Sequence, residues 1–123
     1  MKIQMMSILM AGMLAVSSVT ANERVDHAQG KPAETLEQAV ANFSEGNRQL
    51  SELLATKPMT PDVFHEIHML SYTLENALKK INEEFAALAD TLEEVHLGSE
   101  RMDEGAVVMN GEDYLAVAGK VVK

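Results

Sequence analysis

An apolar repeat from Phe64 to Val95 constrains this chain more than any other feature. Apolar side chains recur there at alternating steps of three and four residues for more than four heptads, with one polar member. The repeat consists of Phe64, Ile67, Ser71, Leu74, Leu78, Ile81, Phe85, Leu88, Leu92 and Val95. A spacing that averages 3.5 residues keeps one stripe of a helix in register over a long distance, as in coiled coils and helical bundles. The segment therefore predicts a long helix that packs against other helices.

The boundaries of this long helix are marked by local signals. Thr60 supplies an N-cap hydroxyl, and Pro61 suits the first helical position because its missing N–H would have no helical partner there. Gly98 weakens the helix, but Ser99 and Met102 continue the repeat, so we expect the helix to end near Met102 after about 42 residues. Met102 is expected to fill the end of the apolar stripe.

A shorter helix is predicted before it, from Pro32 to the break at Lys57-Pro58. Its apolar stripe, with one polar interruption, consists of Leu36, Val40, Phe43, Asn47, Leu50 and Leu54. Gly46 costs about 1 kcal/mol relative to alanine in a helix. It therefore indicates a kink or a place where another backbone comes close.

A third helix is predicted after Asp103, which can act as its N-cap. Its stripe consists of Val107, Gly111, Tyr114, Ala118 and Val121, and the small Gly111 and Ala118 allow a close approach to a neighbouring helix. No strand-like alternation and no βαβ pattern are present. The predicted fold is all-α, an antiparallel bundle of three helices in the order short, long, short.

The helix lengths suggest that one chain cannot cover its own long helix. Two helices of about 24 and 18 residues, laid antiparallel along one of about 42, cover it end to end and barely overlap each other. Each half of the long helix then has a single partner, and the apolar stripe, flanked by Leu70 and Ala77, stays partly exposed. An antiparallel homodimer with a two-fold axis near Ile81 and Asn82 would give four helices in cross-section at each end. The alternative is a bend near Gly98 that produces a compact three-helix monomer.

Charge favours the antiparallel arrangement of such a dimer. Acidic residues crowd the C-terminal half of the long helix and the turn after it, opposed there only by Arg101. A parallel pair would bring the two acidic ends together, whereas an antiparallel pair separates them.

The N-terminus carries the pattern of a secretory signal. A basic start, an apolar run, IQMMSILMAGMLAV, and the small-residue sequence Val19-Thr20-Ala21 predict a signal peptide over residues 1–21. A flexible polar leader is expected over 22–31 and a helical domain over 32–123. The processed chain has net charge −10, because removal of Lys2 leaves nine basic and nineteen acidic residues. We therefore expect a soluble periplasmic or secreted protein with no membrane anchor, no disulfide and no nucleic-acid partner.

Histidines are the candidate metal ligands. His65 and His68 lie three residues apart beside the apolar stripe, close enough to share one ion, but a tight zinc or copper site needs three or four ligands. His96 lies about 42 Å further along a straight helix and cannot complete the site within one chain. Across the antiparallel dimer His68 would face His96 of the second copy. The histidines then predict two shared sites for zinc or copper, with solvated flank histidines as the alternative.

Other chemistry has little support in the sequence. No histidine falls on the apolar stripe, which argues against a haem bundle. Asn47 and Ser71 are polar residues at stripe positions and are interpreted as devices that fix the helix register. No nucleophile motif, phosphate-binding glycine loop or HExxH pair is present, so no enzymatic activity is predicted.

The segments GKPAETLEQAVANFSEGNRQLSELLA, IHMLSYTLENALKKINEEFAALADTLEEVHLGSE and DYLAVA, together with the signal sequence, resemble a family of small exported bacterial proteins classed as a domain of unknown function. The resemblance implies an exported helical protein and supplies no site residues. In shape the chain is also similar to periplasmic four-helix cytochromes, but it lacks their core ligands. We expect a non-enzymatic protein that acts by association with itself or with another helical partner. The alternative is a transition-metal binding module built on His65, His68 and His96.

Overall fold

The computed structural model describes residues 29–122, which form three helices and no strand. Helix α1 covers Leu36–Ala55, α2 covers Pro61–Glu100 and α3 covers Glu104–Ala118, with 20, 40 and 15 residues. The prediction of an all-α bundle in the order short, long, short is thus confirmed. The predicted signal peptide, residues 1–21, and the leader residues 22–28 lie outside the described residues.

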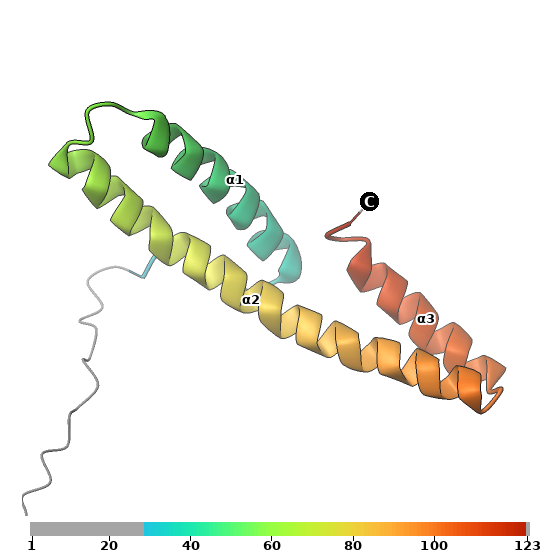
Figure 1. Ribbon diagram of the computed structural model, residues 1–123. Coiled ribbons are helices and arrows are strands. Elements are labelled where there is room, and N and C mark those ends of the chain that lie inside the picture. The colour runs from blue at the N-terminus through green and yellow to red at the C-terminus, as the bar shows by residue number, and fades with distance from the viewer. Residues whose placement is uncertain (1–28, 123) are drawn as a thin grey trace, which may run out of the picture.

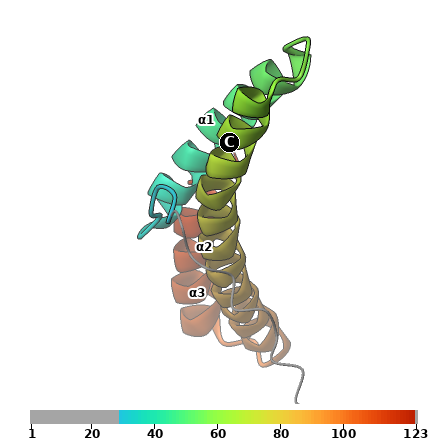
Figure 2. The same ribbon diagram turned by 90° about the vertical axis from the view of Figure 1, so that its left-hand side faces the viewer.

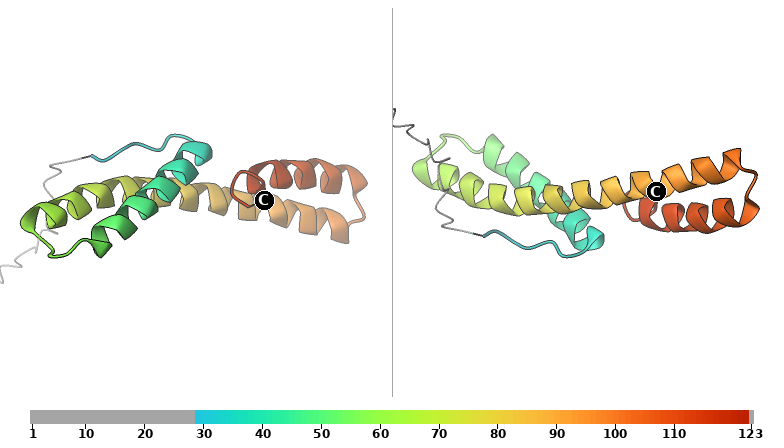
Figure 3. Two further views of the ribbon diagram at one scale, coloured as in Figure 1. Left: turned by 90° about the horizontal axis from the view of Figure 1, so that it is seen from above. Right: turned by 90° about the horizontal axis from the view of Figure 1, so that it is seen from below.

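The two short helices lie on the same side of α2 and run back along its two halves (Figure 1). The end-on view in Figure 2 shows α1 and α3 on one flank of α2, and the views in Figure 3 show α1 crossing α2 obliquely. Among the described residues, helix-to-helix contacts join α1 to α2 and α2 to α3 only. Each half of α2 therefore has one helical partner, as the helix lengths predict.

An ion pair connects the two short helices where their ends meet. Lys120 Nζ, just beyond α3, lies 3.0 Å from Glu37 Oε1 in the first turn of α1. The hydrogen bond from Lys120 holds the pKa of Glu37 below its ordinary value. Both side chains are exposed, so this ion pair should contribute little to the stability of the fold.

Helix α2 begins at the predicted signal and ends at Glu100, two residues before the predicted end. The Thr60 hydroxyl accepts a hydrogen bond from the Val63 N–H, and Pro61 occupies the first turn. The helix runs through Gly98 without ending, so the bend of the alternative monomer is not seen. The reversal comes at Met102, which has a φ of 55° and is 90% exposed, while the Asp103 N–H donates to the Gly98 carbonyl. The expectation that Met102 fills the apolar stripe is therefore wrong, because the left-handed turn directs it into solvent.

Helix α1 begins four residues later than predicted, at Leu36 rather than Pro32. Thr35 is the N-cap, and its hydroxyl accepts from the Gln38 N–H, while Gln38 Oε1 accepts from the Glu34 N–H. This reciprocal pair is a variant of the capping box, whose signature Thr35-x-x-Gln38 is present in the sequence. A cap that satisfies two amide groups favours a start at Leu36 over the weaker signal of a first-turn proline.

The residues before α1 form an extended segment, the strap (residues 29–34), that crosses α2. The Lys31 N–H donates to Thr73 Oγ1 at 2.9 Å, and Asn76 Nδ2 donates to the carbonyls of Gln29 and Lys31 at 2.7 and 3.2 Å. Gly30 has a φ of +64°, and a Cβ there would meet the Thr73 backbone nitrogen at 2.6 Å. The last part of the predicted flexible leader, residues 29–31, is therefore docked on α2, because side chains of that helix satisfy its backbone groups.

Replacing Asn76 with alanine should release the strap without unfolding the helices. The change removes two hydrogen bonds to strap carbonyls, each with a net contribution of about 1 kcal/mol. Amide hydrogen exchange at Lys31 should accelerate about tenfold or more, whereas exchange in the middle of α2 should stay unchanged. Asn47→Ala, at an exposed asparagine of α1, is the matched control and should leave Lys31 protected. Equal acceleration in both variants would contradict the role assigned to Asn76.

Charged side chains cover the outer face of α1. Arg48 lies between Glu45 and Glu52 and donates hydrogen bonds to both carboxylates. The guanidinium holds the pKa of Glu45 at about 2, mainly through its hydrogen bonds. Glu45 therefore stays ionised over the physiological range, and its side chain is exposed to solvent. In the described part of the chain, no helix is both long enough and apolar enough to cross a membrane.

Candidate interaction surface and histidine pairs

The principal surface feature of residues 29–122 is a row of apolar side chains along α2 that neither α1 nor α3 covers. Phe64, Leu78, Phe85 and Leu92 are 60%, 42%, 42% and 46% exposed. They occur at multiples of seven residues, with the half-buried Ser71 in the remaining place. We call these five residues the apolar ridge. It extends about 42 Å at 1.5 Å per residue.

The ridge is exposed because α1 and α3 pack on a neighbouring row of α2. Val63, Ala77 and Gly98 are buried, and they too lie at multiples of seven residues. Between this row and the ridge lie Ile67, Leu74, Ile81, Leu88 and Val95, which are half-buried. The predicted stripe is therefore correct in period and half covered, but the covered face of α2 is rotated towards Leu70 and Ala77.

Small residues explain this rotation. On α1 the buried positions are Leu36, Ala39, Asn42 and Gly46, rather than the whole predicted stripe. A Cβ at Gly46 would meet Leu74 Cδ2 at 2.7 Å, so the close approach expected there occurs, although the neighbour is a side chain and not a backbone. The distance between packed helices depends on the side chains at the contact, so α1 and α2 approach where Gly46 and Ala77 leave room. The larger stripe residues are displaced to the edge.

A glycine also allows the close contact between α2 and α3, and here it is Gly98. A Cβ at Gly98 would lie 3.2 Å from both Ala106 Cβ and Val107 Cγ2. By contrast, a Cβ at Gly111 would meet nothing within 4 Å, so the close approach predicted at Gly111 is wrong. Gly98 is the small residue at this contact because α3 leaves the turn directly opposite it.

An apolar groove lies between α2 and α3 beside the ridge. It has a volume of about 320 Å³ and is lined by Phe85, Leu88, Ala89, Leu92, Tyr114, Ala118, Val121 and Val122. Two ridge residues, Phe85 and Leu92, form one wall. Helix α3 has no fully buried residue, so its apolar stripe is only partly covered within the chain. The groove and the ridge form one continuous apolar face on this half of the molecule.

Four of the five ridge residues, Ser71 to Leu92, are symmetric about one point of α2, and Phe64 corresponds to Ser99 in that register. Leu78 and Phe85 are equally far from a point between Ile81 and Asn82, and so are Ser71 and Leu92. A second ridge placed antiparallel over the first would therefore set Leu78 against Phe85 in both directions. A self-complementary patch of this kind is what a two-fold interface requires.

The two halves of the chain differ in charge. Residues 31–81 contain seven acidic and five basic side chains, whereas residues 82–122 contain ten acidic and two basic ones. Antiparallel pairing would place the strongly acidic half of one copy against the nearly balanced half of the other. Parallel pairing would place the two strongly acidic halves together, which like-charge repulsion disfavours.

The three histidines predicted as metal ligands are on α2 and are exposed, but the structure does not bring them together within one chain. His68 Nε2 lies 3.3 Å from the Tyr72 hydroxyl, with the two rings in an edge contact at 5.0 Å. His65 instead borders the groove between α1 and α2 that Glu52, Glu66 and Met69 also line. In the described range 29–122, no three His, Cys, Asp or Glu side chains form a group that could hold a metal ion.

His96 has a carboxylate neighbour that the sequence analysis did not single out. Its Nε2 lies 3.2 Å from Glu100 Oε1, one helical turn further on. The spacing of four residues places the two side chains on the same face of α2. The signal His96-x-x-x-Glu100 is present in the sequence and could have been recognised there.

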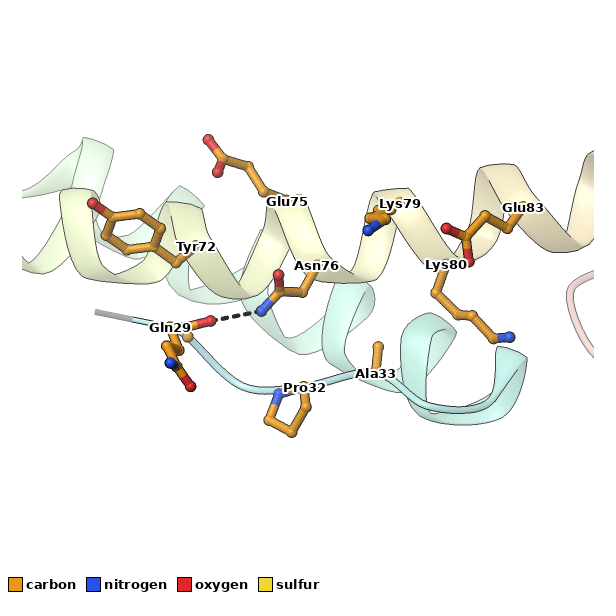
Figure 4. Close-up of a pocket in the computed structure, with 10 residues that line it drawn as sticks. Gln29, Pro32, Ala33, Tyr72, Glu75, Asn76, Lys79, Lys80 and Glu83 are labelled. Carbon is orange, nitrogen blue, oxygen red and sulfur yellow. Dashed lines mark hydrogen bonds between the residues drawn. The ribbon is translucent and has the colours of Figure 1, made fainter. Parts of the chain in front are cut away.

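A polar groove lies between the strap and α2 (Figure 4). Gln29, Pro32 and Ala33 form one side of this groove, and side chains of α2 from Tyr72 to Glu83 form the other. Lys80 is engaged by Glu84 at 2.6 Å, and Asn76 binds the strap carbonyls. We therefore interpret this groove as part of the contact between the strap and α2.

These features define the class of the protein: residues 29–122 form an all-α arrangement of three helices that encloses only half of the long central helix. The chain belongs to a family of unknown function, DUF6746, whose family model matches residues 1–123. The resemblance to a domain of unknown function is thereby confirmed. The chain has no significant match among curated proteins or among solved structures.

Proposed function

We propose that this protein acts by association and has no enzymatic activity, and that its first partner is a second copy of the same chain. The observation that carries the proposal is the apolar ridge, with four large side chains between 42% and 60% exposed along one face of α2. The buried apolar side chains of the described residues are few, namely Leu36, Ala39, Val63 and Ala77. A chain with so thin a core gains stability from covering the ridge.

In the proposed dimer the two α2 helices pack antiparallel, ridge against ridge. Near each end, the two α2 helices are joined by α1 of one copy and α3 of the other, which makes four helices in cross-section. The symmetric spacing of the ridge and the unequal charge of the two halves both favour this orientation. The predicted signal peptide supports an association in the periplasm or outside the cell.

The pairing can be tested by cross-linking, because the chain contains no cysteine. A single Asn82→Cys variant has its thiol next to the proposed two-fold axis and should oxidise to a covalent dimer in high yield. Ser71→Cys alone should remain largely uncross-linked, since its counterpart lies far away in an antiparallel pair. A mixture of Ser71→Cys and Leu92→Cys should form the mixed disulfide.

Two results would contradict this geometry. Efficient self-cross-linking of Ser71→Cys would indicate a parallel pair. A wild-type protein that remains monomeric in sedimentation equilibrium at high concentration would exclude self-association through the ridge.

A further inference from the structure

We propose that the antiparallel dimer contains two equivalent sites for a borderline divalent transition metal such as zinc, each formed by His68 of one copy and by His96 and Glu100 of the other. This inference rests on the self-association proposed above and adds the ligand that the interface takes. A set of two imidazoles and one carboxylate, with water in the fourth position, is a common zinc environment. Imidazole ligands suit copper as well.

One half of the site is already assembled within a single chain. His96 Nε2 and Glu100 Oε1 lie 3.2 Å apart. Two ligand atoms that each lie about 2.0–2.1 Å from a tetrahedral zinc ion are about 3.3 Å from each other. The pair therefore has the separation that a shared metal ion requires, with no change of backbone. Both side chains are more than 60% exposed, so a second chain can reach them.

The other half is His68, which the structure holds on the flank of α2 next to the ridge. Its ring packs edge-on against Tyr72, with the centroids 5.0 Å apart. An oriented ring loses less freedom when it binds a metal, and hydrogen-bond partners of a ligating histidine commonly fix it in this way. The described contact of His68 Nε2 is with the Tyr72 hydroxyl at 3.3 Å, and in the proposed site the other ligands come from the second copy.

The positions of the two histidines along α2 bring the two halves of the site together in the dimer. His68 lies 14 residues before Asn82 and His96 lies 14 residues after it, in the same heptad row. This row adjoins the apolar ridge, and its midpoint at Asn82 lies within half a residue of the point about which Leu78 and Phe85 are symmetric. The antiparallel pairing that sets Leu78 against Phe85 therefore also sets His68 against His96 of the second copy. Within one chain the two histidines are about 42 Å apart along the helix and cannot share an ion.

His65 is not part of this site, although it is three residues from His68. Its side chain borders the groove between α1 and α2, with Glu66 and Met69, and lies further from the apolar ridge than His68 does. His65→Ala is therefore the matched control: it removes an exposed histidine from the same turn of the helix and leaves the three proposed ligands in place.

The test is a calorimetric titration of the purified protein with zinc. The wild type and His65→Ala should bind two zinc ions per dimer. His68→Ala, His96→Ala and Glu100→Gln should each lose at least about 100-fold in affinity, because even outer-sphere partners of metal ligands contribute about 10–100-fold. Circular dichroism should show unchanged helix content, since all three side chains are exposed.

Mixing two inactive variants makes the test specific for a shared site. A dimer of His68→Ala with His96→Ala keeps one complete set, formed by His68 of the second chain with His96 and Glu100 of the first. An equimolar mixture should therefore regain one high-affinity zinc ion per mixed dimer, although neither variant alone binds. A site within one chain would show no such recovery.

The outcomes separate this inference from the dimer itself. A dimer whose mixed variants do not regain zinc, or whose affinity is equal in the wild type and His68→Ala, overturns the metal site and leaves the self-association standing. A monomer that binds no zinc overturns both. A dimer that forms only when zinc is added, and not in His68→Ala, supports the site and makes the metal a condition of association.

Discussion

Replacing Phe85 with glutamate is expected to convert the protein from a dimer to a monomer. Phe85 is 42% exposed, belongs to the ridge and forms one wall of the apolar groove. In the antiparallel dimer both copies of Phe85 contact Leu78 of the other chain, and together they should contribute about 1.5–3 kcal/mol. A carboxylate at this position adds a desolvation cost, so the dissociation constant should rise at least about 100-fold. Sedimentation equilibrium over a range of concentrations measures this change.

Ala86→Glu is the matched control for this experiment. Ala86 is the next residue along α2, is exposed, and points about 100° away from the ridge. The variant adds the same charge to the same turn and should remain dimeric. If Ala86→Glu dissociates as readily as Phe85→Glu, the effect arises from net charge and the ridge is not the interface.

Truncating Leu36 to alanine should have the largest effect on the stability of the single chain. Leu36 is 3% exposed and is the largest of the buried apolar side chains among the described residues. Loss of a buried leucine costs about 2–5 kcal/mol in free energy of unfolding. In a domain of this size the midpoint of thermal unfolding should fall by about 10 °C or more.

The measurement is thermal and urea unfolding followed by circular dichroism, at concentrations where the association state is known for both proteins. Met109→Ala removes a similar volume from α3, where Met109 is 61% exposed, and should change the free energy of unfolding by no more than about 0.5 kcal/mol. A comparable loss in both variants would mean that Leu36 is not a principal contributor to the core.

The helices themselves were predictable because their signals are local. Thr60 with Pro61 and Asp103 with Glu104 mark the starts of α2 and α3, and caps depend on a few neighbouring residues. The predicted start of α1 is too early because it depends on the first-turn proline alone and does not include the capping pair of Thr35 and Gln38. A helix tends to begin at the residue where its first free amide groups find hydrogen-bond acceptors.

The face that each helix buries was harder to predict, because it depends on two helices at once. The repeat of Phe64 and its successors identifies the apolar side of α2, but Gly46, Ala77 and Gly98 determine where the neighbours come closest. A stripe read from one helix does not contain this information. The docking of the strap through Asn76 was missed for the same reason, since its partners are 45 and 47 residues away.

The candidate metal residues were only partly recoverable from spacing. The positions of His68 and His96 about Asn82 can be read from the sequence, whereas the orientations of His65 and of Glu100 depend on rotamers and neighbours that the structure supplies. The dimer and the exported location stay predictions.

The absence of helix contacts between α1 and α3 in the described chain has a consequence for how the molecule opens. Each short helix forms a hairpin with its own half of α2, so one can detach while the other keeps its contacts. The α3 hairpin contains no fully buried side chain on its C-terminal helix, whereas α1 buries four residues. Local unfolding should therefore begin at the C-terminal hairpin and stop near the centre of α2. The two ends of this small protein should then differ in local stability.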